Sequence, residues 1–198
     1  MKKLHSIPVL VVAVMILSAC GGKKEESEEQ KSTLGALKEF SEKAEEMSKK
    51  EAVEPVSFQE LKELLPSELA GIPRTEAEGE SNGTMGFKIS VAKGKYKTDD
   101  KSIDVDIMDL GGVGGFAIAG LAAWTLAESE RETDNGYERT IKLDGHKGFE
   151  KYSNTDKSGE LKLFLNERFL VSLEGENLSM DEIKSAFRKI DFSKLPKE

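Results

Sequence analysis

Cysteine and histidine are almost absent from this 198-residue chain, which has one cysteine, Cys20, and two histidines, His5 and His146. A single cysteine cannot form an intrachain disulfide, so the fold must be held by an apolar core. Zinc sites usually need several converging Cys or His ligands, and this chain does not supply them. His146 lies in the glycine turn Asp144-Gly-His-Lys-Gly148, a context typical of a solvated loop residue.

Long hydrophobic runs are also missing. The apolar run from Ile7 to Leu17 is too short to span a bilayer comfortably, since a helical span needs about 20 residues. It follows Lys2 and Lys3 and ends in small residues, which is the layout of an export signal. The pattern predicts a signal peptide at residues 1–19.

The end of this signal, Leu17-Ser18-Ala19-Cys20 followed by two glycines, resembles the lipobox of bacterial lipoprotein precursors. The resemblance implies cleavage before Cys20, attachment of diacylglycerol to its sulfur and acylation of the new amino group with a fatty acid such as palmitate. Several acyl chains on one residue give a stable membrane anchor. The alternative is an ordinary secretory signal with an accidental cysteine.

Basic residues are outnumbered, 29 against 37 acidic ones. Removal of residues 1–19, which contain two lysines and no acid, would leave a net charge of −10. Such a body repels phosphate groups, which argues against nucleic acid as a partner. We expect a location in the cell envelope. Because Gly21 rather than Asp follows the cysteine, resemblance to known sorting rules favours the periplasmic side of the outer membrane if the source has two membranes.

The first segments after the signal are polar. Residues 20–33 hold the lipidated cysteine and a charged tether with little to bury. Residues 34–54 are predicted to contain an amphipathic helix, whose apolar positions recur every three or four residues: Leu34, Leu37, Phe40, Ala44 and Met47. The helix either docks on its own domain or forms a coiled coil or membrane-surface helix.

Residues 56–198 are predicted to form one globular domain. Capping boxes at Ser57-Phe-Gln-Glu60 and Ser179-Met-Asp-Glu182 mark two helix starts. Alternation predicts a hairpin from 84–92 to 103–107, strands at 137–143 and 149–153, and a second hairpin from 160–165 to 168–174. We therefore expect an α+β fold, with an antiparallel sheet of about five to seven strands and packed helices.

The later strands and terminal amphipathic helix resemble, in outline, small envelope domains of the PsbP/Mog1-like kind. The globular part also looks like the many small bacterial lipoproteins to which no activity is assigned. Both likenesses imply an envelope protein and neither implies a reaction.

The stretch from Asp109 to Trp124, DLGGVGGFAIAGLAAW, matches part of a dinucleotide-binding fingerprint at Gly112-x-Gly114-x-x-Ala117. That fingerprint needs a parallel βαβ unit, and the neighbouring strands read as antiparallel hairpins, so no cofactor is predicted. The interpretation favoured here is a core helix over 111–127. The alternative is a partly exposed interaction surface with Phe116, Ala119, Ala123 and Trp124.

Two functional hypotheses remain open. The first is a non-catalytic module, anchored to the membrane by lipid at Cys20, that binds an envelope protein or a small ligand. The second is a carboxylate-dependent hydrolase or calcium-binding domain using Asp104 and Asp106, which share one polar strand face, with Asp109 at the strand end. The first hypothesis carries no catalytic residue, metal site or cofactor, and the oligomeric state stays open.

Overall fold

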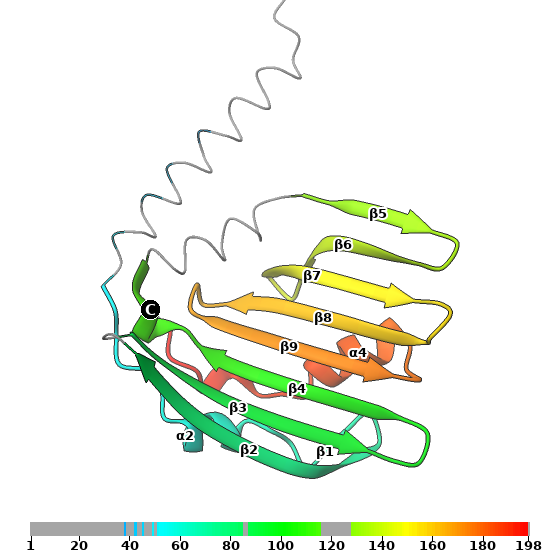
Figure 1. Ribbon diagram of the computed structural model, residues 1–198, viewed down its shortest axis with the longest axis horizontal. Helices are drawn as coiled ribbons and strands as arrows, with labels where there is room; N and C mark the ends of the chain where they lie inside the picture. The colour runs from blue at the N-terminus through cyan, green and yellow to red at the C-terminus, as the bar shows by residue number, and fades with distance from the viewer. Residues whose placement is uncertain are drawn as a thin grey trace, which may run out of the picture.

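The computed structural model describes residues 38, 42, 45, 49, 51–84, 87–115 and 128–197. Within these residues, nine strands form one antiparallel sheet in the order β1-β2-β3-β4-β9-β8-β7-β6-β5 (Figure 1). The sheet consists of two meanders, β1 to β4 and β5 to β9, which meet where β4 pairs with β9.

The strands are β1 (Glu68–Leu69), β2 (Ile72–Thr84), β3 (Phe87–Lys97), β4 (Ser102–Asp109), β5 (Glu130–Thr133), β6 (Gly136–Leu143), β7 (His146–Ser153), β8 (Ser158–Leu165) and β9 (Phe169–Glu176). The helices with described bounds are α2 (Phe58–Glu63), α4 (Met180–Phe187) and the 3-10 turns η1 (Gly111–Val113) and η2 (Phe192–Lys194).

The predicted α+β architecture with several packed helices is wrong. A single nine-stranded sheet dominates the described residues, and α4 is the one helix with described bounds that exceeds six residues. The strand count was underestimated because β1, β2 and β5 lie at or next to the sheet edges and carry mostly polar side chains. The segment β2 reads IPRTEAEGESNGT, and all four residues of β5 are exposed. Alternation detects strands with one buried face, and these strands give little such signal.

Both predicted hairpins are confirmed. Strand β3 pairs with β4, and β8 pairs with β9 through a turn in which Asn166 and Glu167 adopt positive φ angles of 50° and 49°. Along β4, alternate side chains are buried, so Ile103, Val105 and Ile107 point into the core. The period-2 pattern therefore located the central strands correctly.

The core lies on one face of the sheet, called here the covered face, where α2 and α4 pack. In Figure 1 both helices lie behind the sheet. Fully buried side chains on this face include Val105, Leu173 and Leu161, whose backbones pair in sequence across β4, β9 and β8. Leu61 of α2 and Ile183 of α4 join the same cluster. The opposite face, which carries Asp104, Asp106 and Met108, is called the open face.

Both predicted capping boxes are present. The Ser57 hydroxyl accepts a hydrogen bond from the Glu60 amide, and the Ser57 amide donates to the Glu60 carboxylate, both at 3.3 Å. Ser179 and Glu182 repeat the arrangement at α4. Hydrogen bonds from the Ser179 backbone, the Ser179 hydroxyl and Lys101 lower the pKa of Glu182, in that order of size.

Near the N-terminus, Lys38, Glu42 and Glu45 are helical and exposed, with ion pairs Lys38–Glu42 and Glu45–Lys49 at 3.7 and 2.9 Å. The predicted lipobox and tether lie outside the described residues, as does most of the predicted 34–54 helix. In the described part of the chain, no helix combines the length and apolar character that a membrane span requires.

Candidate functional site

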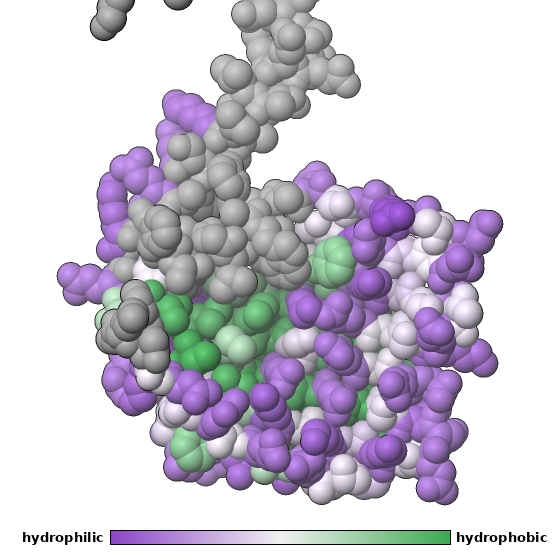
Figure 2. All heavy atoms as spheres, viewed as in Figure 1, coloured by the Kyte–Doolittle hydropathy of each residue, from purple (hydrophilic) through white to green (hydrophobic). Residues whose placement is uncertain are grey.

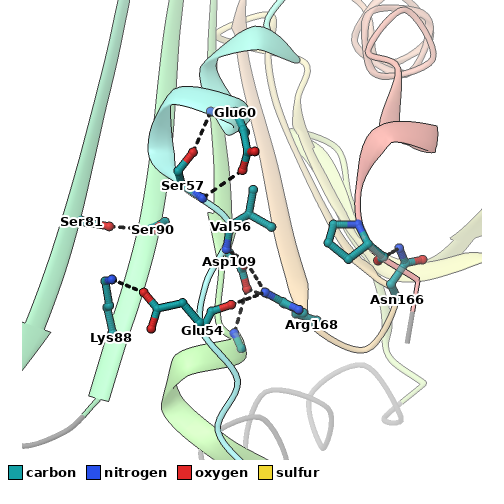
Figure 3. Close-up of polar contacts among 12 residues, drawn as sticks. Glu54, Val56, Ser57, Glu60, Ser81, Lys88, Ser90, Asp109, Asn166 and Arg168 are labelled. Carbon is teal, nitrogen blue, oxygen red and sulfur yellow. Dashed lines mark hydrogen bonds and ion pairs between the residues drawn. The ribbon is translucent and has the colours of Figure 1, made fainter.

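Asp109 is a highly connected polar side chain on the covered face. Its carboxylate is fully buried and accepts two hydrogen bonds from Arg168, Nε to Oδ1 and Nη2 to Oδ2, each at 2.7 Å (Figure 3). The amides of Val56 and Gly111 each donate to one of its oxygens at 2.8 Å. Because four donors surround the two oxygens, the carboxylate is fully engaged in holding the fold.

This arrangement ties three distant segments together. Residues 53–56, called here the strap, run past the end of β4. The Val53 amide donates to the carbonyl of Gly111 at 2.9 Å, and Arg168 also donates to the carbonyl of Glu54 at 3.1 Å. The Glu54 side chain forms an ion pair with Lys88 of β3. The Asp109–Arg168 pair therefore fixes the strap, the end of β4 and the β8–β9 turn in one place.

The sequence contained a signal for this burial. Asp109 has the same strand parity as Ile103, Val105 and Ile107, all of which point into the core. Asp104 and Asp106 have the other parity and lie on the open face. The structure thus separates Asp109 from the two carboxylates with which the sequence had grouped it.

A second buried carboxylate, Glu150 of β7, also has cationic partners. Arg139 Nε donates to its Oε1 at 2.7 Å, and Lys184 Nζ of α4 lies 2.5 Å from Oε2. The Lys184 contact lacks hydrogen-bond alignment and is best described as an ion pair. The Arg139 guanidinium lies 4.8 Å from the centre of the Tyr137 ring. Burial, followed by the charge of Glu150, raises the pKa of Tyr137. Sequence reasoning missed Glu150, because a glutamate within an alternating strand looks like a solvent-facing residue.

Asp104 and Asp106 are each paired in register with a lysine of β3, Asp104 with Lys95 and Asp106 with Lys93. Asp104 is exposed as predicted, whereas Asp106 is half-buried. Burial raises the pKa of Asp106, while the charge of Lys93 acts in the opposite direction. The sequence therefore placed both carboxylates on the correct face. The structure adds that each lies opposite a lysine, which compensates its charge.

Next to Asp104 the open face has a shallow polar depression of about 360 Å³. Its charged and hydroxyl-bearing lining residues are Ser102, Asp104, Lys151, Ser153, Ser158, Glu160, Glu174 and Glu176. Asp106 is not part of the lining. Among the residues that the structure describes, no group of three or more His, Cys, Asp or Glu side chains is arranged to hold a metal ion. The depression and the charged side chains around it are called here the charged half of the open face.

The other half of the open face is apolar. It consists of Leu110 and the partly buried side chains that pack against it: Ile89, Met108, Val113, Phe164 and Leu170. These residues are called here the apolar band. Figure 2 shows a green apolar area on this face, bordered by hydrophilic residues.

The first part of the glycine loop has a steric role. A Cβ atom on Gly112 would lie 2.0 Å from the carbonyl oxygen of Lys88, and Gly114 adopts a positive φ of 69°. Both positions therefore favour glycine without any ligand. The candidate interaction residues Phe116, Ala119, Ala123 and Trp124 lie outside the described residues. His146 begins β7 directly after a tight turn at Asp144 and Gly145.

Comparisons with protein-family models, curated proteins and solved structures find no match to this chain.

Proposed function

We propose that this protein is a lipoprotein of the cell envelope, anchored through Cys20, whose non-catalytic domain binds a protein partner or small ligand. The observation that carries the proposal is the charged half of the open face. There, Asp104, Glu160 and Glu174 lie around a shallow depression, and the described helices α2 and α4 pack on the other face of the sheet. A broad, polar, shallow surface suits recognition better than chemistry, since catalytic sites usually enclose their reacting groups.

The distribution of carboxylates supports the same proposal. Asp109 and Glu150, the fully buried acids among the described residues, are both paired with cations and hold segments of the fold together. On the open face, Asp104, Asp106 and Glu160 are more accessible, and each is paired in register with a lysine: Lys95, Lys93 and Lys151, respectively. Neither set combines a nucleophile, a base and an orienting group, which is the arrangement that an enzyme of the usual kinds requires.

The anchor is tested by replacing the sulfur of Cys20, the atom to which diacylglycerol would be attached. Cys20→Ser is expected to abolish labelling by a fatty-acid probe and to release the protein from the membrane fraction, because serine offers no thiol for diacylglycerol. Labelling of wild type and variant in growing cells, followed by fractionation, measures both effects. A variant that still incorporates the probe would rule out acylation at Cys20.

The binding surface is tested by comparing two exposed glutamates on opposite sides of the sheet. A photo-crosslinking residue at Glu174, on the open face, is expected to give a discrete higher-mass adduct in intact cells. The same residue at Glu63 of α2 is the matched control, since both positions are exposed. Equal adducts at both positions, or none at Glu174, would argue against an open-face partner.

The alternative function is a hydrolase or calcium-binding domain that uses Asp104 and Asp106. The observation in its favour is that burial raises the pKa of Asp106. A metal bound only by the folded state would make melting depend on its free concentration. Stoichiometric metal in the purified protein, or a chelator-induced fall in Tm that Asp104→Asn/Asp106→Asn abolishes, would replace the binding proposal with this alternative.

A further inference from the structure

The apolar band is continuous across three central strands. Met108 of β4, Leu170 of β9 and Phe164 of β8 are direct partners in the register, so their side chains form one row on the open face. Among the described residues of this cluster, only Leu110 and Val113 lie outside the strands. Since α2 and α4 occupy the covered face, the described part of the chain leaves most of the row without a partner layer.

The connection from β4 to β5 has four strands of the sheet to bridge. The described chain stops at Gly115, two residues after Val113, and resumes at Glu128, just before the edge strand β5. Four strands lie between β4 and β5, so the two are separated by five strand spacings, roughly 24 Å. Twelve residues reach roughly 18 Å as a helix and about 40 Å when extended, so little length remains for a detour around α2 or α4.

The composition of the connection matches the apolar row. Residues 116–127 read FAIAGLAAWTLA, with no charged side chain, in a chain of which 33% is charged. Exposing so apolar a segment to water would be unfavourable, and burying it against Met108, Leu170 and Phe164 removes apolar surface from both sides. The short length of the connection and its apolar composition therefore both favour the open face.

We infer that residues 116–127 of this chain occupy the apolar band. The apolar half of the open face is then filled from within the molecule, and the charged half around Asp104 and Glu174 is what remains for a partner. This inference does not depend on the lipid anchor or on the identity of a partner.

Trp124, the only tryptophan of the chain, reports on this inference directly. In the full chain, we expect Trp124 emission at short wavelength and weak quenching by acrylamide. Met108→Lys, which places a charge in the row, is expected to shift the emission to longer wavelength and to increase quenching. The matched control is Ser172→Lys, one row away on the open face and paired in register with Asp106. It is expected to leave both signals unchanged.

Three outcomes would overturn the inference. Trp124 could be freely quenched in the parent protein, or Met108→Lys and Ser172→Lys could have equal effects. Alternatively, the shielding of Trp124 from acrylamide could disappear on dilution, which would assign the apolar band to a second copy of the chain.

If Met108→Lys loses the strand signal in circular dichroism, Phe164→Ala gives a milder perturbation of the same row. Hydrogen exchange then measures the protection of the backbone amides of residues 116–127 independently of Trp124. Unchanged protection in Phe164→Ala would count against the inference.

Discussion

Asp109→Ala is expected to lower the free energy of unfolding by about 3–5 kcal/mol, the cost of breaking a buried ion pair by removing one partner. The substitution leaves Arg168, whose side chain is only 12% exposed, without its carboxylate. It also deprives the amides of Val56 and Gly111 of their acceptor. Urea denaturation of wild type and variant, followed by circular dichroism, measures the loss.

Asp104→Ala is the matched control. It removes the same group from the same strand, but on the open face, where the side chain is exposed. Its effect should stay within about 0.5 kcal/mol, as for most surface substitutions. Equal losses in the two variants would show that Asp109 does not have the structural role assigned to it.

The double variant Asp109→Leu/Arg168→Met separates the ion pair from the rest of the network. Replacing both charges by apolar groups removes the uncompensated guanidinium, so part of the loss should be recovered. Recovery should be incomplete, because the Val56 and Gly111 amides still lack an acceptor and a buried unsatisfied donor costs about 1–3 kcal/mol. A full recovery would mean that the strap does not need this carboxylate.

The part of the fold that was predictable from sequence is the part with one-sided burial. Alternation at Ile103, Val105 and Ile107, and again at Leu161 and Leu163, located central strands with their correct partners. Both helix starts followed from the reach of a serine hydroxyl to the third amide of the helix, a strictly local geometry. Helix caps and strands with one buried face can therefore be predicted from the sequence.

The strands that were missed have no such pattern in the sequence. In β2, Glu76, Glu78 and Glu80 alternate with Ala77, Gly79 and Ser81, so the strand resembles a polar loop. It is held to β3 by ten register pairs, and composition does not reveal this backbone pairing. The same limitation applied to the buried ion pair, since the role of Asp109 depends on Arg168, 59 positions away. Identifying that partner requires the strand order of the sheet.

The packing of α4 on the sheet depends on two glycines. Gly159 and Gly175 are register partners on β8 and β9, and a Cβ atom added to either would lie within 2.9 Å of the Ile183 side chain. The absence of side chains at this pair lets the helix approach the strands closely. Ile183 is fully buried there, so the contact is part of the core rather than of the surface.

Gly175→Ala and Ile183→Ala are therefore expected to compensate each other. Alone, Gly175→Ala overpacks the contact and should cost about 1–3 kcal/mol. Alone, Ile183→Ala leaves a cavity and should cost about 2–5 kcal/mol. In the double variant, the added methyl group enters space vacated by Ile183 Cγ1 and Cδ1, the two atoms it would otherwise approach at 2.9 Å. The combined loss should then fall short of the sum by about 0.5–3 kcal/mol.

The control cycle combines Gly175→Ala with Phe187→Ala, one helical turn further along α4. Phe187 is also buried, so its removal costs a comparable amount of core packing. It is not among the atoms nearest to the added methyl group. Urea denaturation of all single and double variants should give additive losses for the Phe187 cycle and a compensating term for the Ile183 cycle. Additivity in both cycles would mean that α4 does not rest on the glycine pair, and that its position is set instead by the larger side chains of the core.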